Sequence, residues 1–214
     1  LAAIWGSSFL FTRIAAPIIN PVWLIEIRVL LAGLVLLPFL WKSNLVAELK
    51  QKIIPLFVIG CFNLAVPFLL FAFASLYLSS GFAAILNATT PLVGTIVAFG
   101  WLKEKFTLSR FLGLVIGFTG VVILVGWDRM LTSPSQILAI AAGLLASVMY
   151  AVTGVYIKLY LSNVSPLTFA VGGQLSAAIA ILPLVPFTVP QTLPNQSAII
   201  STIALALLAT SLAY

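Results

Sequence analysis

Residues 5–38 read WGSSFLFTRIAAPIINPVWLIEIRVLLAGLVLLP, and 145 positions later residues 150–183 read YAVTGVYIKLYLSNVSPLTFAVGGQLSAAIAILP. Aligned without gaps, the two stretches match at two prolines and one basic position: Pro21 with Pro166, Pro38 with Pro183, and Arg13 with Lys158. Matches between Leu and Ala carry little weight in a chain this apolar, so the signal rests on the prolines, the charge and the spacing. We therefore interpret the two stretches as copies of one repeat.

The composition places the chain in a membrane. Hydrophobic residues make up 63% of it, charged residues only 7%, and its mean hydropathy is +1.25, whereas a soluble domain has roughly 25% charged residues. The chain has no His and a single Cys, Cys61, which excludes a disulfide framework and a His or thiolate metal site, so we expect no metal and no cofactor. The net charge of +6 lies in short loops, where it indicates membrane topology and not a nucleic-acid partner.

Polar or proline-containing breaks divide the chain into eight apolar segments, each near the length that spans a bilayer. They are residues 1–16, 22–41, 53–76, 81–102, 109–127, 136–157, 166–187 and 197–214. We predict helices for all of them, because they lack the alternation of barrel strands and an open sheet edge cannot be satisfied in lipid. The expected fold is therefore an all-α, polytopic helical bundle. Five segments separate the starts of the two copies, and this odd number of crossings predicts an inverted second copy.

The repeat predicts a division into residues 1–127, with five helices, and residues 136–214, with three. The first segment is short and has neither a Met nor a charged flank, and the last one stops inside an apolar run at Tyr214. We therefore expect a fragment of a longer protein.

The loop charges predict the orientation of the helices. One set of loops carries most of the basic residues: Lys42, Lys50, Lys52, Lys103, Lys105, Arg110 and Lys158. The intervening loops hold little beyond Arg129, with Arg13 near the far end of the first segment. Because cytoplasmic loops are enriched in Lys and Arg, we expect a cytoplasmic N-terminus in the inner or plasma membrane.

Two helices carry polar faces that could line a substrate path. Trp5, Ser8 and Thr12 share one face of the first helix, because residues three, four and seven apart lie together on a helix. The alternative is an interfacial Trp with hydroxyls bonded to their own backbone. In the sixth segment Gly143, Ser147, Tyr150 and Gly154 share one face, with Thr153 beside it, and the repeat pairs Tyr150 with Trp5, which favours the path.

Two further segments combine an amide with a proline. Asn63 lies one turn before Pro67, and Asn87 lies one turn before Pro91, next to Thr90. A proline frees a backbone carbonyl near each amide, and interrupted helices of this kind expose polar groups to substrate in transporters. Each amide could instead form a hydrogen bond across a helix interface. Gln174 in the seventh segment is a weaker candidate for the same path.

The remaining charged and small residues support weaker predictions. Arg13, Glu26 and Arg28 could serve coupling or bind substrate at the outer mouth, although an Arg13–Glu26 ion pair or snorkelling would explain them as well. In the fifth segment a stripe of small residues predicts close helix packing: Gly113, Gly117 and Gly120.

Four passages together resemble the EamA family of the drug/metabolite transporter superfamily. They are Trp5-Gly6-Ser7-Ser8-Phe9, Pro21 to Arg28 running into Leu-Leu-Ala-Gly, the block from Leu76 through Ser79, Ala83, Asn87 and Pro91 to Leu102-Lys103-Glu104, and the glycine-patterned helix Gly113 to Gly126. The resemblance implies ten helices in two inverted five-helix repeats around a shared cavity. It also implies export or import of small metabolites, often amino acids and related solutes, by alternating access.

We therefore expect a secondary transporter and not an enzyme, with a small-molecule substrate and membrane lipids as its partners. The sequence does not determine whether the protein forms a homodimer. A passive channel or a structural membrane subunit is the alternative. An intramembrane lipid-modifying enzyme fits less well, because such chemistry usually needs clustered acids, His or a metal, and Glu26 is the single acid at membrane depth.

Overall fold

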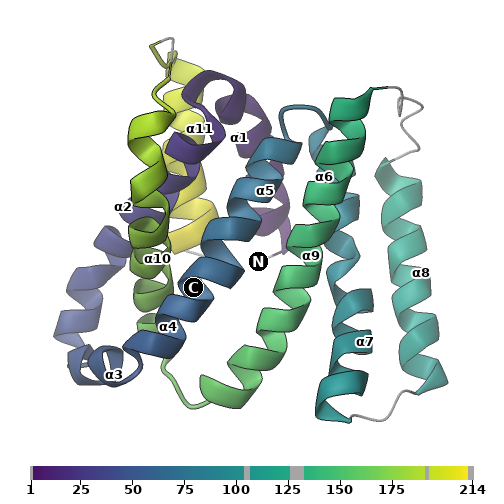
Figure 1. Cartoon of the computed structure of the whole chain (residues 1–214), viewed down its shortest axis with the longest axis horizontal. Helices are drawn as coiled ribbons and strands as arrows, with labels where there is room; N and C mark the ends of the chain where they lie inside the picture. Colours follow the sequence, from purple (N-terminus) through teal and green to yellow (C-terminus); the bar gives the residue numbers. More distant parts are fainter. Residues whose placement is uncertain (1, 104–106, 126–132, 191–192, 212–214) are drawn as a thin grey trace.

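The computed structural model describes residues 2–103, 107–125, 133–190 and 193–211. Within these ranges every regular element is a helix, and all eight predicted segments are helical (Figure 1). The elements are α1 (Ala2–Ile19), α2 (Pro21–Lys42), α3 (Val46–Gln51), α4 (Ile53–Ile59), η1 (Gly60–Ala65), α5 (Val66–Ala74), α6 (Ser80–Ala88), α7 (Thr90–Leu102), α8 (Leu108–Val125), α9 (Pro134–Tyr160), α10 (Pro166–Ile181), η2 (Leu182–Phe187), α11 (Gln196–Ala206) and η3 (Leu207–Ser211). Five helical spans are long and apolar enough to cross a membrane, and three shorter apolar helices accompany them. The chain is a polytopic helical membrane protein.

Some boundaries differ from the predicted ones. The first helix continues past residue 16 to Ile19 with Pro17 inside it, and α9 continues through Lys158, which we had placed in a loop, to Tyr160. A short helix that the sequence did not predict, α3, lies in the lysine-rich connection after α2. Lys105, Arg129 and residues 126–127 and 212–214, where predicted segments end, lie outside the described residues.

The 145-residue offset is visible in the helices themselves. Shifted by 145, α2 covers the same positions as the continuous span Pro166–Phe187. The caps correspond too, because Asn20 and Ser165 each accept a hydrogen bond from a backbone N–H of the first turn that follows. The π-helical segment η3 falls on residues 62–66 after the same shift and so overlaps η1, the other π-helical segment of the described chain.

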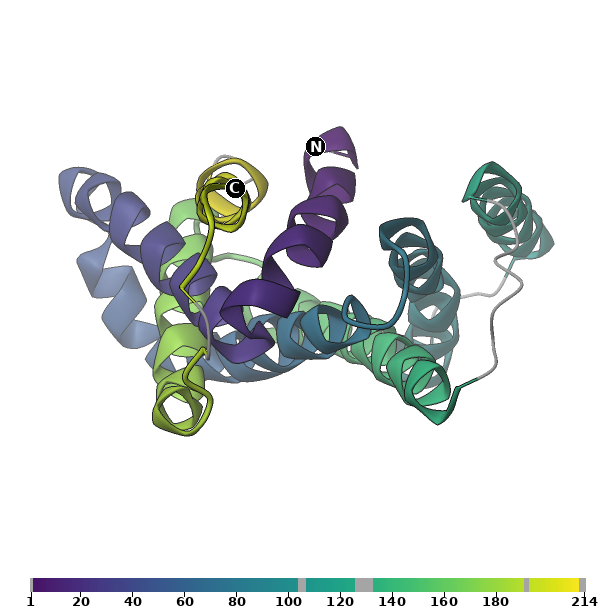
Figure 2. The same cartoon turned by 90° about the horizontal axis from the view of Figure 1, so that it is seen from above.

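The two copies run in opposite directions. Near the start of α2, Trp23 Nε1 donates to the Val185 carbonyl at 3.1 Å, whereas further along α2 a Cβ on Gly33 would lie 2.7 Å from Leu175 Cδ2. Since position 23 pairs with 185 and position 33 with 175, α2 and α10 are antiparallel. The two helices are in contact, and the view from above shows them crossing in one half of the bundle (Figure 2).

The lysine-bearing elements gather at one end of the bundle. In Figure 1, α3, the C-terminal end of α7 and the α9–α10 connection all lie at the bottom, whereas the α1–α2, α5–α6 and α10–α11 connections lie at the top. This end carries Lys50 in α3, Lys103 directly after α7 and Lys158 in the last turn of α9. The structure thus separates the two sets of loops as the charge pattern requires.

The helix α8 lies at the edge of the bundle, where it contacts α6 and α7 (Figures 1 and 2). A Cβ added at Gly113, Gly117 or Gly120 would meet no atom within 4 Å. The close packing that the glycine stripe predicts is therefore not made among the described residues. A stripe of small residues indicates that a close approach is sterically possible, but the sequence does not say which helix, if any, makes it.

Candidate functional site

The polar face of α9 contacts α6 through Ser147. Its hydroxyl lies 2.8 Å from the Leu86 carbonyl of α6 and 3.1 Å from the Gly143 carbonyl of its own helix. A Cβ on Gly143 would lie 2.6 Å from Leu86 Cδ1, so the Leu86 side chain occupies the space that a larger residue at position 143 would need. The contact holds α9 against α6 directly beside Asn87.

One turn and a half further along α9, Thr153 contacts η1. The Thr153 hydroxyl lies 2.6 Å from Asn63 Oδ1 and 2.7 Å from the Met149 carbonyl. A hydroxyl has one proton to donate, so Thr153 serves either the amide or its own helix at any moment. The pair links the two copies of the repeat through a hydrogen bond that has an alternative partner.

An aromatic cluster lies between these two contacts. Tyr150 stacks on Phe71 of α5 with ring centroids 6.2 Å apart, and Phe9 of α1 meets the same Phe71 edge-on at 5.3 Å. The predicted path residue Tyr150 thus joins α1, α5 and α9. We name the residues Asn63, Asn87, Ser147, Tyr150 and Thr153 the α9 seam.

Both Asn–Pro segments distort their helices. A proline has no N–H, so Pro67 and Pro91 remove the α-helical donors for the carbonyls of Asn63 and Asn87. Before Pro67 the helix forms the π-helical turn η1, in which Val66 N–H donates to the Cys61 carbonyl. Before Pro91 the helix is interrupted between α6 and α7. Near that break the buried Thr90 hydroxyl has no hydrogen-bond partner within the part of the chain that the structure describes. π-Helical turns are frequent at functional sites.

The hydroxyls on α1 serve their own helix. Ser8 donates to the Trp5 carbonyl, and Thr12 donates to the Ser8 carbonyl at 2.7 Å. Trp5 itself is 51% exposed. The structure therefore favours the backbone-bonded alternative for Ser8 and Thr12, and it does not bring this face into the α9 seam by any hydrogen bond between described residues.

The charged candidates are separated. The guanidinium of Arg13 donates to the Ser75 carbonyl at the end of α5, so the Arg13–Glu26 ion pair that we considered is not formed. Glu26 is only 6% exposed, and its Oε2 has no hydrogen-bond partner among the described residues. Arg28 is buried too: it donates to Thr210 at 2.9 Å and lies 3.8 Å above the Phe68 ring. Both side chains are therefore buried inside the bundle and do not snorkel to the interface.

Gln174 is the most completely buried polar side chain at the crossing of α2 and α10. It is 0% exposed, and neither its Oε1 nor its Nε2 has a partner among the described residues. A Cβ added to Gly33 of α2 would lie 3.4 Å from the Cβ of Gln174. An amide in this position either only fills space in the interior or acts in another conformation of the protein.

Replacing Gln174 with Leu tests these alternatives. A buried polar group without a partner costs about 1–3 kcal/mol, so we expect Gln174→Leu to raise the unfolding free energy by about 1 kcal/mol. The measurement is the thermal unfolding midpoint of the purified protein in detergent, with Ser176→Ala on the same helix as a control. A lower midpoint for Gln174→Leu would show that the amide has a partner in the protein as purified.

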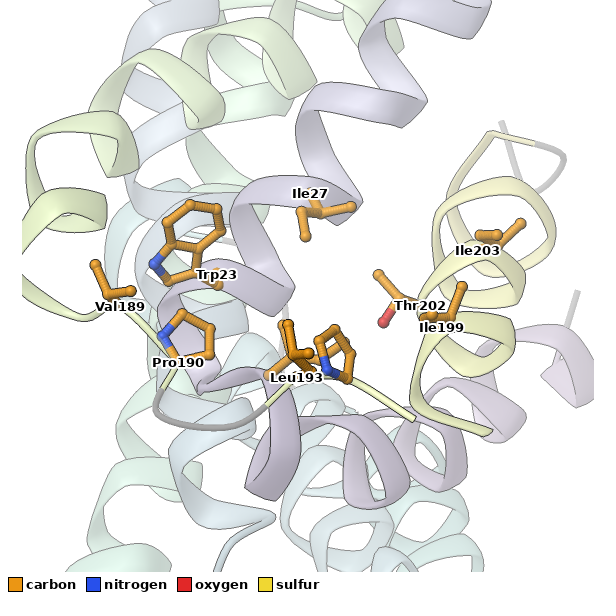
Figure 3. A pocket seen from close by; sticks show the side chains of 10 residues that line it. Trp23, Ile27, Val189, Pro190, Leu193, Ile199, Thr202 and Ile203 are labelled. Atoms are coloured by element: carbon orange, nitrogen blue, oxygen red, sulfur yellow. The ribbon is translucent and has the colours of Figure 1, made fainter. Parts of the chain in front are cut away.

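Residues that the sequence did not predict as site residues line a pocket of about 500 Å³ at the upper end of the bundle. Trp23 and Ile27 of α2 lie across this hollow from Ile199 and Thr202 of α11 (Figure 3). The remaining lining residues are apolar: Ile19, Val189, Pro190, Leu193, Pro194 and Ile203. Its two polar groups are already used, because Trp23 Nε1 donates to Val185 and the Thr202 hydroxyl to Ala198.

At the lower end of the bundle, Glu48 of α3 joins the N-terminus of α10. Its carboxylate accepts hydrogen bonds from Ser165 N at 3.2 Å, from Ser165 Oγ at 2.6 Å and from Thr168 Oγ1. These donors stabilise the ionised form and, with the nearby Lys52, hold the pKa of Glu48 below its ordinary value of 4.5. In the sequence, the one signal for this contact is the single acid, Glu48, in a loop otherwise rich in lysine.

This contact predicts a pH dependence. Because the pKa of Glu48 is lowered in the folded protein, its contribution to stability is complete above the ordinary pKa of 4.5 and is lost as the pH falls through the lowered value. We expect the difference in unfolding midpoint between wild type and Glu48→Gln to be constant from about pH 6 to 8 and to shrink as the pH falls below the ordinary pKa of 4.5 toward the lowered one. A difference that grows on acidification would contradict the assignment.

The comparisons agree with this architecture. The EamA-like transporter family matches residues 1–126 and 137–214. An uncharacterized transporter of Buchnera aphidicola subsp. Schlechtendalia chinensis is 32% identical over 77% of this chain and 55% of its own length. Protein PagO of Salmonella typhimurium is 30% identical over the same shares, 77% and 55%.

A crystal structure at 17% identity superimposes with a TM-score of 0.76 over 99% of this chain and 72% of the other, which shows a shared fold. The chain spans a little over half the length of the two relatives named above. The match of the family to both halves of the helical bundle shows that this chain is a member of the EamA-like transporter family.

Proposed function

We propose that the protein is a secondary transporter that moves a small metabolite across the inner or plasma membrane by alternating access. Residues 1–127 and 136–214 are the two inverted repeats, and they rock against each other with the N-terminus in the cytoplasm. One observation carries the proposal: the Thr153–Asn63 hydrogen bond of 2.6 Å joins the two copies at a π-helical turn. The Thr153 hydroxyl can exchange the Asn63 amide for the Met149 carbonyl. A contact that can exchange partners, at a distorted helix between the repeats, suits a site whose hydrogen bonds must break and form again during transport.

The side chains of the α9 seam suggest the class of solute. They are amides, hydroxyls and an aromatic ring without charge, which favours an uncharged, zwitterionic or aromatic metabolite over a multiply charged one. Arg28, buried beside Thr210 and Phe68, is placed to receive a carboxylate nearer the outer end. A neutral seam with one cation above it fits an amino acid or a related solute.

Asn87, Thr90 and Pro91 belong to the same proposed path. Asn87 is half-buried and follows Leu86, whose carbonyl accepts the Ser147 hydroxyl. The Thr90 hydroxyl, which has no partner among the described residues, adds a donor at the break between α6 and α7. Trp5, Ser8 and Thr12 would line the path from the other side only if α1 turned or the two repeats moved.

Transport by the full-length protein in proteoliposomes tests the proposal. A carrier gives saturable uptake and counterflow, in which unlabelled solute inside the vesicles accelerates entry of labelled solute. A screen of neutral amino acids, aromatic metabolites and multiply charged organic acids should show counterflow for the first two classes. Conductance without saturation would instead indicate a channel, and turnover of a lipid without solute flux would indicate an enzyme.

A further inference from the structure

The two ends of the bundle differ at positions that the repeat makes equivalent. The 145-residue shift carries the pocket residues Trp23, Ile27, Leu193 and Pro194 onto Thr168, Gly172, Glu48 and Leu49. At the upper end these positions border a pocket of about 500 Å³, in which Leu193 is 95% exposed. At the lower end the same positions are in contact.

The lower contact is both polar and apolar. Glu48 accepts hydrogen bonds from Ser165 and Thr168 at the start of α10. Beside it a Cβ on Gly172 would lie 2.8 Å from Leu49 Cδ1 and 2.7 Å from Leu56 Cδ1, so these leucines fill the space over the glycine. Leu56 is completely buried, in a cluster with Ile59 and Leu161.

At the equivalent positions of the upper end, the described residues form neither the polar nor the apolar part of this contact. Leu193 stands in place of Glu48 and Trp23 in place of Thr168, so the carboxylate–hydroxyl contact of the lower end cannot form between these two positions. Ile27 stands where the lower end has Gly172, and the Cβ-bearing side chain keeps the wall from being covered as closely. The asymmetry therefore lies in the sequence as well as in the conformation.

We propose that the Glu48 carboxylate, bound to Ser165 and Thr168, is a latch that holds the cytoplasmic end closed while the outer pocket is open. The inference rests on the proposed alternating-access function and names the group that controls which side of the site is open. Opening to the cytoplasm requires the hydrogen bonds of Glu48 to break and Leu49 and Leu56 to leave Gly172. Charge-assisted hydrogen bonds are stronger than neutral ones, so the latch biases the protein toward the outward-open state.

Two cysteine reporters test the latch in the full-length protein with Cys61→Ala as background. Leu56→Cys reports on the closed lower end, and Ile199→Cys, at a 46% exposed position of the outer pocket, reports on the open upper end. Each reporter is combined with Glu48→Gln, with Thr168→Val, or with the control Lys50→Gln on the exposed side of α3. A membrane-impermeant maleimide is applied to inside-out vesicles for the first reporter and to right-side-out vesicles for the second.

We expect Glu48→Gln and Thr168→Val each to raise the labelling rate of Leu56→Cys roughly tenfold, and to lower that of Ile199→Cys. Lys50→Gln should change neither rate, and the double variant Glu48→Gln with Thr168→Val should match the single ones. Unchanged labelling of Leu56→Cys in both variants would overturn the latch, and so would faster labelling of both reporters, which indicates loosening of the whole fold.

The measurement separates this inference from the transport proposal, because labelling needs neither a substrate nor solute flux. Opposite changes in the two labelling rates support the latch even if no solute in the proteoliposome screen is transported. Counterflow with unchanged labelling supports the carrier and rejects the latch.

Discussion

Gly60→Ala is expected to prevent stable packing of η1 against α10. The added Cβ would lie 2.4 Å from Ser176 Cβ, 2.8 Å from the Ala177 nitrogen and 2.9 Å from the Gly173 carbonyl oxygen. Two of these atoms belong to the backbone, so rotation of a side chain cannot relieve the clash. Overpacking of a well-packed interior commonly costs 1–3 kcal/mol, and we expect a loss of about 3 kcal/mol or failure to accumulate folded protein.

A matched glycine substitution distinguishes this clash from a general effect of alanine. A Cβ at Gly154 of α9 would meet nothing within 4 Å, and Ala is favoured over Gly inside a helix by roughly 0.5–1 kcal/mol. Gly154→Ala should therefore leave the unfolding midpoint unchanged or raise it slightly. If Gly60→Ala were as stable as Gly154→Ala, the close contact between η1 and α10 would be incorrect.

Asn63→Leu is expected to reduce the transport rate by an order of magnitude or more while the protein stays folded. The substitution removes the amide from the π-helical turn, and the Thr153 hydroxyl keeps its other acceptor, the Met149 carbonyl at 2.7 Å. No buried donor is left without a partner. Hydrogen bonds between membrane helices contribute about 0.6–2 kcal/mol, so the unfolding midpoint should fall only modestly, whereas counterflow should be nearly lost.

Thr153→Val and the double variant complete a cycle for this pair. If Asn63 and Thr153 act together, each single variant and the double variant should lose transport to a similar extent, since effects within one hydrogen-bonded pair are not additive. Thr188→Val, which removes a hydroxyl bonded to the Leu184 carbonyl of its own turn, serves as the chemical control. Wild-type counterflow in Asn63→Leu would remove Asn63 from the proposed site and leave the fold unaffected.

Much of the fold followed from residue patterns that act locally. Apolar length predicted the eight helical segments, because a bilayer admits few other structures. The pairing of Pro21 with Pro166 predicted a repeat, and the structure shows matching spans, caps and π-helical turns at that spacing. The prolines also marked both distorted helices, since the loss of an N–H acts within one turn.

The candidate site was predictable only residue by residue. Asn63 and Thr153 were both named from the sequence, but nothing in either segment indicated that they meet. Ser147 and Thr153 each reach a neighbouring helix as well as their own, whereas the described hydrogen bonds of Ser8 and Thr12 stay within their own helix. Whether a hydroxyl bonds to its own helix or to a neighbour depends on which helix packs beside it, and that choice is not local.

The sequence by itself determined the membrane environment, the helices, the lysine-rich side and the 145-residue repeat, because each depends on composition or on spacing along the chain. Only the tertiary structure decided that α9 brings Ser147 and Thr153 to Leu86 and Asn63. Only it showed Glu48 bound at one end and an open pocket at the equivalent place at the other. Contacts between residues 61 to 117 positions apart depend on how the helices pack, and short-range sequence patterns carry little information about that packing.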